Sequence, residues 1–425
     1  MAARAAGTSS GLPLLPDQSD INDATNFLNN LGQPPPPGQQ QLPPPGPQPR
    51  YSNIAAAKEW ARNITDSGDG YMRLLDTQWE TLNNIPINLV PAHQAAIRPV
   101  LEWLDEEPQS VAAWAMLLAY PAMTLRKDTY RGGKKSGNNN PVKHRLSRFA
   151  SGDWASLWDE TIQQGVKERA GKLRRHNLSL NSTDPPQTDS QKLKQTHKRA
   201  IRQVDFGNYG SARDVLSDSK LAPANEDTLQ QLREKHPQAP AQSGVPDHLR
   251  QEAPAWAEAE IVIEDHEVIK AISKGKKATA CDRWGWRLEH FIPLSQDLGI
   301  LTLLKNVLVL GARGKMPAPI AAASAGARLI AVLKARGGVR PIGITDTLQK
   351  LIGRLLTEDV KQAVAQQLHS DNPRVKQFAI GVPAGCPKLA TYIQRYLDKH
   401  PGCVIASSDC HNAFQEMSHE CAATG

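Results

Sequence analysis

The chain has 425 residues, a formal net charge of +7 at pH 7 and a sequence pI of about 9.1. A hydrophobic share of 40% is enough for a core, whereas 32 prolines and a mean hydropathy of -0.48 indicate long unstructured segments. A basic chain favours polyanionic partners, nucleic acid ahead of an anionic membrane, although a surplus of this size is also common in proteins that bind neither. No uncharged apolar run is long enough to span a bilayer, and residues 1–20 do not have the pattern of a signal peptide. The expectation is a nuclear or cytoplasmic protein that is not secreted and has no membrane partner.

Cysteine usage fits a reducing compartment. The five cysteines are odd in number and form no C-x-x-C pair, which argues against a disulfide framework: Cys281, Cys386, Cys403, Cys410 and Cys421. The last three crowd together with His411 and His419, but their spacing matches no structural zinc pattern. We therefore expect no zinc site there.

The first half of the chain alternates between low-complexity and helical patterns. Residues 1–50 are rich in proline and are expected to be a disordered tail, either a plain tether or a ligand for a proline-reading module. Residues 51–180 carry apolar side chains at helical spacing, interrupted by a basic loop, and their aromatic residues are expected in a core. The pattern of residues 181–255 predicts a linker and then helices that precede the region 256–425, where regular secondary structure is expected.

The positive charge of the chain is concentrated between residues 126 and 202. The stretch LRKDTYRGGKKSGNNNPVKHRLSRF mixes basic residues with glycine and asparagine, and two basic helical patterns follow it. Such a region can contact phosphates or act as a nuclear import signal, and a solvated loop is the simpler alternative.

The pattern becomes regular from about residue 260. It predicts a short helix over 266–273, a helix over 300–308 with Gly311 as its C-cap, and an apolar strand over 327–334. A hairpin turn at Gly337-Gly338 precedes a long helix that Asp346 and Gln349 are expected to cap.

Two further elements are predicted near residue 400. Pro387 opens a helix whose apolar face is expected to turn inward, and this face comprises Leu389, Tyr392, Ile393 and Tyr396. Residues 403–408 have the composition of a strand that delivers Asp409 to its end.

Four charged or carbonyl-bearing positions suit nucleotide chemistry. A strand-end carboxylate such as Asp409, with the backbone carbonyl of Cys410, offers the hard oxygen ligands that magnesium prefers, although the same residues also suit a simple turn. Lys334 and Arg340 can hold phosphates, Arg340 by a bidentate fork. In a strict two-residue loop, strand alternation puts these two cations on opposite faces, and a plain basic surface hairpin is the alternative.

An ordered series of motifs resembles the reverse transcriptases of non-LTR retrotransposons. K-x-x-G-G-x-R-P-I is followed by LIGRLL, by QFAIGVPAGCPKLATYIQRYL and then by SSDCHNAF, and CDRWGWRLEHF stands where that family has a Gly-Pro-Asp-Gly loop. The resemblance covers about 195–425. It implies an α+β fold, in which a helical N-terminal region is followed by an incomplete right-hand fingers and palm domain over 256–425.

The resemblance also implies roles for individual residues. Asp409 becomes the first metal-binding aspartate of the palm, with Mg²⁺ as cofactor and the Cys410 carbonyl as a further ligand. Phe414 sits under the sugar of the incoming deoxynucleoside triphosphate, with a core aromatic as the alternative, and Arg340 and Lys334 face the triphosphate. Gln377 and Gly381 shape the template-side floor. RNA template and DNA primer are the implied partners.

Several parts of the family pattern are missing from this sequence. The paired aspartates of the following hairpin, the glycine-rich template segment and the thumb have no counterpart, so the resemblance predicts a chain truncated within the palm that is inactive alone. One alternative is a non-catalytic nucleic-acid-binding protein that uses the basic region 126–202. A third possibility is a protein-interaction module that works through the proline tail and the helices.

Overall fold

The fold is described from a computed structural model. It describes residues 53–66, 70–127, 140–181, 189–216, 221–235, 261–334, 337–368 and 376–408. The chain divides into two compact units, Met1–Pro49 and Arg50–Gly425, and every described residue belongs to the second. The predicted proline-rich tail lies outside the described residues.

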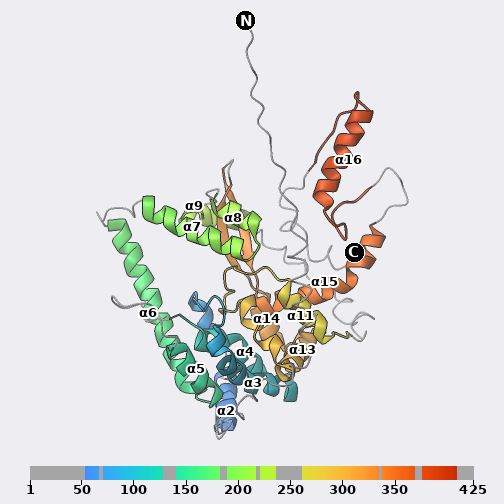
Figure 1. Cartoon of the computed structure of the whole chain (residues 1–425). Coiled ribbons are helices and arrows are strands. Elements are labelled where there is room, and N and C mark those ends of the chain that lie inside the picture. Colours follow the sequence, from blue (N-terminus) through green and yellow to red (C-terminus); the bar gives the residue numbers. More distant parts are fainter. Residues whose placement is uncertain are drawn as a thin grey trace, which may run out of the picture. The chain divides into compact units, whose positions relative to one another are not determined.

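The N-terminal part of this unit is helical, as predicted. Its helices follow one another in this order: α2 (Ile54–Asp66), the 3-10 turns η1 (Gly70–Asp76) and η2 (Ile87–Leu89), α3 (Val90–Glu106), α4 (Val111–Thr124), α5 (Asn140–Ala150) and α6 (Trp154–Asn181). Helix α4 is apolar on all sides, and each of its residues from Ala112 to Thr124 is buried. A helix without a polar face can be stable only when neighbours surround it, and α2, α3, α5 and α6 all contact α4 (Figure 1).

A helical pair and a short third helix follow. Helices α7 (Asp189–Asp205) and α8 (Tyr209–Leu216) pack against each other, and α9 (Glu226–Glu234) comes next. The side chain of Asn225 caps α9 by accepting a hydrogen bond from the Thr228 backbone at 2.9 Å. Within the predicted linker and lead-in 181–255, the structure therefore has helices α7 and α8 between 189 and 216 and helix α9 at 226–234.

The C-terminal part carries further helices and one hairpin. In chain order these are α11 (Asp265–Ser273), α12 (Leu288–Phe291), η4 (Leu294–Gln296), α13 (Leu298–Ala312), α14 (Ala318–Ala325), β1 (Arg328–Leu333), β2 (Val339–Ile344), α15 (Thr347–Gln367) and α16 (Gly385–Lys399). The predicted helices at 266–273 and 300–308 and the strand at 327–334 are confirmed, with α13 longer than expected.

The glycine that follows α13 differs from the prediction. Gly311 lies inside the helix, where a Cβ atom would clash with the Ile352 side chain of α15. Gly314, with φ +66, takes the left-handed conformation just past the helix end. Gly311 is therefore a site of close helix packing, and Gly314 is the residue that ends the helix.

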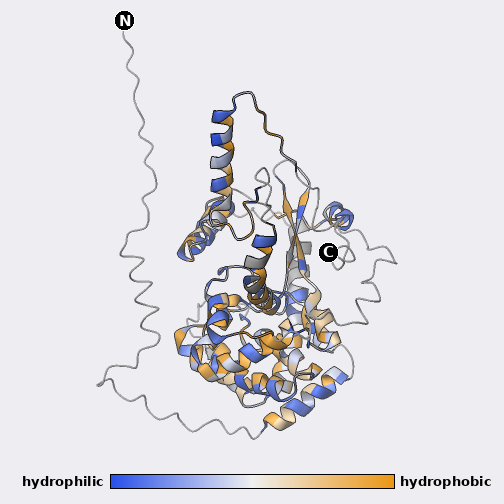
Figure 2. Cartoon of the chain, turned by 90° about the vertical axis from the view of Figure 1, so that its right-hand side faces the viewer, coloured by the Kyte–Doolittle hydropathy of each residue, from blue (hydrophilic) through white to orange (hydrophobic). Residues whose placement is uncertain are grey.

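One hydrophobic core joins the two ends of the unit. It contains buried side chains from 57–158 and from 263–355, so these two stretches, one from each of the predicted segments 51–180 and 256–425, share one core. The Trp286 indole donates to the Leu117 carbonyl at 3.1 Å and stacks on Tyr120 with ring centroids 5.5 Å apart. Figure 2 shows that the helices of this body carry both hydrophobic and hydrophilic residues, as expected of helices that bury one face and expose the other.

The only sheet in the described ranges is the antiparallel pair β1–β2. Leu221 forms an isolated bridge with Val332, and the Ala222 N–H donates to the Ala331 carbonyl at 2.9 Å. The fold is therefore mainly helical with a small sheet, which agrees with α+β in this coarse sense. Within these ranges no helix combines the length and the apolar character needed to cross a membrane.

Two expectations near residue 400 are wrong. Residues 403–408 form no strand, and Val404 and Ile405 are 93% and 51% exposed, because no neighbouring strand lies beside them in the described chain. Helix α16 exists as predicted, but it buries no residue. Its apolar stripe, which includes Leu389, Tyr392 and Tyr396, is exposed.

Candidate functional site

The hairpin β1–β2 has a wider loop than the two glycines alone suggest. The strand register pairs Leu333 with Val339, and the Lys334 N–H donates to the Gly338 carbonyl at 2.9 Å. The Gly337 N–H donates back to the Lys334 carbonyl at 3.1 Å, and both glycines have positive φ. The turn therefore spans Lys334 to Gly338 rather than Gly337-Gly338 alone.

This register brings the two predicted phosphate ligands to the same face. Arg340 pairs with Val332, and Lys334 follows the end of β1 directly, two residues beyond Val332, with its backbone still hydrogen-bonded to Gly338. Side chains alternate along a strand and match across a pair, so Lys334 and Arg340 are diagonal neighbours, with Cα atoms about 7–8 Å apart. Both side chains are exposed. The obstacle posed by a strict two-residue loop does not exist in this hairpin.

The same face carries apolar side chains and one more cation. Ile330 and Val332 are partly buried on it, Ile342 is exposed, and Arg328 stands at the base of the hairpin. Two guanidinium nitrogens of Arg328, Nε and Nη1, have no hydrogen-bond partner among the described residues. Sequence reasoning missed Arg328, although the even spacing from Arg328 to Lys334 was the signal that could have found it.

The base of the hairpin is anchored by a buried polar cluster. Asp346 follows β2 directly, is 1% exposed and accepts a hydrogen bond from the Trp284 indole at 2.9 Å. The Arg283 guanidinium lies 3.4 Å from the other Asp346 oxygen and packs over Trp284. A Cβ on Gly326, two residues before β1, would lie 2.5 Å from Arg283 Nη1. Both ends of the hairpin therefore contact the 282–286 loop.

Asp282 folds that loop and caps α15. Its Oδ1 atom accepts from the backbone N–H groups of Trp284, Gly285 and Trp286 at 2.9 to 3.0 Å. Its Oδ2 atom accepts from the Thr347 N–H at 2.8 Å. The predicted capping box of Asp346 is therefore wrong: Asp346 occupies the N-cap position, but Asp282 supplies the capping oxygen from far back in the chain.

The two buried carboxylates affect each other. Burial and the nearby charge of Asp282 together raise the pKa of Asp346 to about 7, although Arg283 opposes both effects. Burial also raises the pKa of Asp282, while its backbone N–H donors act in the opposite direction. Because the Asp282 oxygens are filled by backbone donors, this pair braces the hairpin and is unsuited to hold a metal ion.

The predicted template-side residues belong to a tightly folded loop. The Gln377 side chain accepts from the N–H groups of Ala379 and Ile380 and donates to the Ile380 carbonyl, all at 2.9 to 3.1 Å. Gly381 has φ +70, and a Cβ there would lie 2.7 Å from the Ala365 side chain of α15. Gln377 therefore braces its own loop and Gly381 allows close contact with α15, while their template-side role stays a prediction.

The remaining predicted site residues, Asp409, Cys410 and Phe414, lie outside the described residues. Within the described ranges, no three His, Cys, Asp or Glu side chains gather in a way that could hold a metal ion.

Part of the basic region 126–202 serves the fold. Arg126 is 6% exposed and donates to the Ala122 and Met123 carbonyls of α4 and to the Thr161 hydroxyl. Arg145 is 5% exposed and donates to the Thr124 and Arg126 carbonyls. These two arginines satisfy the carboxyl end of a buried helix and are not available to a nucleic acid.

Helix α7 presents the exposed cations of that region. Lys194, Lys198 and Arg199 are exposed and form no ion pair within the described part of the chain. The helix pair is tied to the body at its far end, where Gln203 donates to the Ala278 carbonyl and Asn208 to the Lys277 carbonyl, both at 2.9 Å.

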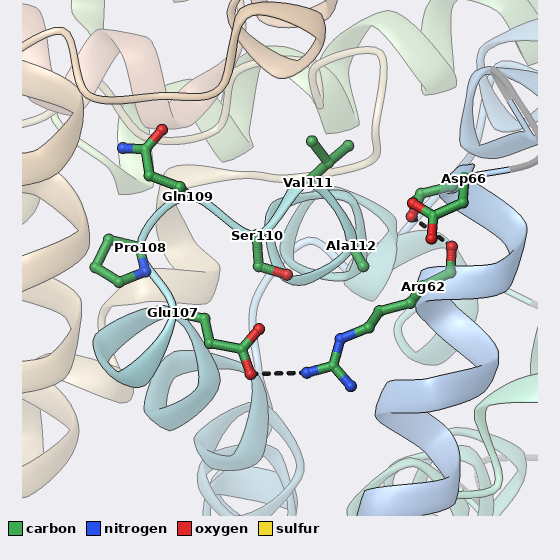
Figure 3. A pocket seen from close by; sticks show the side chains of 9 residues that line it. Arg62, Asp66, Glu107, Pro108, Gln109, Ser110, Val111 and Ala112 are labelled. Atoms are coloured by element: carbon green, nitrogen blue, oxygen red, sulfur yellow. Dashed lines mark hydrogen bonds and ion pairs between the residues drawn. The ribbon is translucent and has the colours of Figure 1, made fainter.

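A cavity of about 510 Å³ opens where the end of α2 meets the turn between α3 and α4 (Figure 3). Its main cation, Arg62, is already paired with Glu107 at 2.7 Å, as the dashed line in Figure 3 shows. The Ser110 hydroxyl is also engaged, because it accepts from the Ala113 N–H as the N-cap of α4. Because Arg62 and Ser110 already have partners, neither side chain is free to bind a ligand, and the cavity is a weak candidate for a binding site.

No protein-family model, no curated protein and no solved structure matches the chain. The functional assignment depends on the order of the sequence motifs and on the geometry of the hairpin.

Proposed function

We propose that this chain is related to the reverse transcriptases of non-LTR retrotransposons and that its hairpin β1–β2 contacts the triphosphate of an incoming deoxynucleotide. The observation that carries the proposal is the register of the hairpin, which gives Lys334 and Arg340 one shared exposed face. Two cationic residues whose Cα atoms are about 7–8 Å apart can both reach one polyphosphate, with Arg340 as a fork and Lys334 as a point charge.

The surroundings of the two cations support this role. The partly exposed Ile330, Val332 and Ile342 on the same face offer apolar contact beside the charges. The buried Asp346 and Trp284 hold the base of the hairpin, so the two cations extend from a fixed point.

The rest of the proposal follows from the resemblance. Asp409 and the carbonyl of Cys410 hold Mg²⁺, which neutralises the triphosphate, and Phe414 lies under the sugar of the nucleotide. RNA template and DNA primer are the partners, and Gln377 and Gly381 lie on the template side.

A photo-crosslinking experiment tests the hairpin. The full chain is mixed with Mg²⁺, an RNA–DNA primer hybrid and a radiolabelled azido-deoxynucleoside triphosphate, and labelled peptides are mapped after irradiation. We expect label in residues 328–344, reduced about tenfold by Lys334→Ala or Arg340→Ala, because each removes a charge-assisted contact of roughly 1.5–3 kcal/mol. Lys388→Ala, which removes an exposed lysine of α16, is the matched control.

The same experiment separates the alternative function. Exposed Lys194, Lys198 and Arg199 on α7 favour a nucleic-acid-binding protein without polymerase ancestry. If the hairpin takes no label, and if hybrid binding is lost when these three residues are changed to glutamine, the reverse transcriptase proposal fails and the alternative stands.

A further inference from the structure

A second cavity lies between helices α11 and α15. Its volume is about 580 Å³, within the usual range for small-molecule sites. Its walls are Ile263, Glu267, Lys270, Ala271, Lys274, Lys350, Gly353, Arg354, Leu355, Thr357, Glu358 and Lys361. None of these belongs to the hairpin or is one of the predicted site residues.

The charge of this cavity is unbalanced. Five of the residues that line it are lysine or arginine, and two are glutamate. Glu358 is shared by Lys270 at 2.9 Å and Lys361 at 3.9 Å, and Glu267 accepts from the Glu264 N–H as part of the cap of α11. Both carboxylates are therefore engaged, and the cavity keeps a positive surplus.

Two ammonium groups stand out in this surplus. The side-chain ammonium groups of Lys274 and Lys350 form neither a hydrogen bond nor an ion pair with any residue that the structure describes. Desolvation by the surrounding protein lowers the pKa of Lys350, while the charges of Asp282 and Asp346 oppose that effect. An ammonium group that has lost part of its hydration gains more from a bound anion than one in bulk water.

The cavity also has an apolar side and, at Gly353, a stretch of helix backbone that no side chain of the described residues covers. Ile263 and Leu355 are buried, and Ala271 is partly buried beside them. Gly353 lies within α15, and a Cβ atom placed on it would meet nothing within 4 Å. A ligand can therefore reach the backbone of α15 at this position.

We propose that this cavity binds the phosphate ester of a nucleoside, with its phosphates on Lys274 and Lys350 and its sugar or base against Ile263, Ala271 and Leu355. The site goes beyond the proposed hairpin function, because the two share no residue. The ester can belong to a free nucleotide or to the 5′-phosphorylated end of a nucleic-acid strand.

Binding of a fluorescent probe tests the site. Titration of the full chain with mant-ATP is expected to give saturable binding, weakened about tenfold or more by Lys274→Met or Lys350→Met through the loss of a charge-assisted contact. Gly353→Phe fills the cavity and is expected to abolish binding. Gly353→Ala adds only a methyl group and favours the helix, so it is the matched control that keeps binding.

Competition identifies the source of the phosphate. A 5′-phosphorylated tetranucleotide that displaces mant-ATP, when its 5′-hydroxyl counterpart does not, assigns a strand end, whereas displacement by neither assigns a free nucleotide. The proposal is overturned if mant-ATP does not bind, or if Lys274→Met, Lys350→Met and Gly353→Phe all bind it as the wild type does. Lys334→Ala, which tests the hairpin, is expected to leave mant-ATP affinity within twofold, so the two proposals fail independently.

Discussion

At the scale of single residues, Asp346 shows how burial sets the chemistry at the base of the hairpin. Its carboxylate is 1% exposed and lies near a second buried carboxylate, and Arg283 and the Trp284 indole offset these effects only in part. Its pKa is about 7 in the folded chain, against an ordinary value of 3.8. Between these pH values the unfolded chain releases the proton while the folded chain retains it.

This asymmetry predicts the pH dependence of stability. The contribution of Asp346 is fully present below about pH 4 and is lost as pH rises towards 7, at roughly 1.4 kcal/mol per pH unit. Asp346→Asn keeps an oxygen for the Trp284 indole and removes the titration. The difference in unfolding free energy between variant and wild type should therefore shift in favour of the variant by on the order of 2 kcal/mol between pH 5 and pH 8.

Urea unfolding of both proteins at the two pH values measures this shift. Asp297→Asn is the matched control, since Asp297 is also an N-cap aspartate, on α13, but its side chain is 35% exposed. An equal difference at pH 5 and pH 8 for Asp346→Asn would show that the carboxylate stays ionised throughout.

At the scale of elements, α15 and α16 have similar amphipathic sequences and opposite environments. Leu351 of α15 is 1% exposed and belongs to the core, whereas Leu389 of α16 is 40% exposed and α16 buries no residue. Sequence periodicity reports that a helix has an apolar face, but it does not report whether another element covers that face.

This contrast predicts unequal costs for the same substitution. Leu351→Ala removes buried methyl groups and is expected to cost about 2–5 kcal/mol. Leu389→Ala is expected to cost less than about 1 kcal/mol, because its side chain is already solvated. Urea denaturation followed by far-UV circular dichroism gives both values, and similar costs at the two positions would mean that α16 packs on a partner surface.

The same limit explains which parts of the site were predictable. The hairpin, α13 and α15 follow from local patterns, since alternation, helical spacing and a glycine pair all lie within a few residues. The capping of α15 by Asp282 depends on a contact across 65 residues of chain and has no local signature. The length of the hairpin loop follows from the strand register, in which Leu333 pairs with Val339. The glycine pair does not fix this register, because it depends on the alignment of both strands over their whole length.

At the scale of the whole molecule, the predicted polymerase segment shares its core with the N-terminal helices. Trp286 reaches the Leu117 carbonyl and Tyr120 of α4, and the Thr81 hydroxyl donates to the Gly285 carbonyl at 2.7 Å. Gly285 has φ +100, and a Cβ there would lie 2.8 Å from Thr81, so this joint fits closely. The loop that anchors the hairpin is thus itself supported by the N-terminal helices.

A split-chain experiment follows from this shared core. Residues 256–425 expressed alone are expected to lack the near-UV circular dichroism of packed tryptophans, because Trp286 and the rest of their apolar surface lose the helices that cover it. Co-expression with residues 51–181 is expected to restore that signal and to yield a complex that co-purifies. The matched control carries Leu117→Asp in the 51–181 fragment, which puts a charge into the joint. Native near-UV signal from 256–425 alone would show that the polymerase-like segment folds independently, and the N-terminal helices would then be an attached module rather than half of one core.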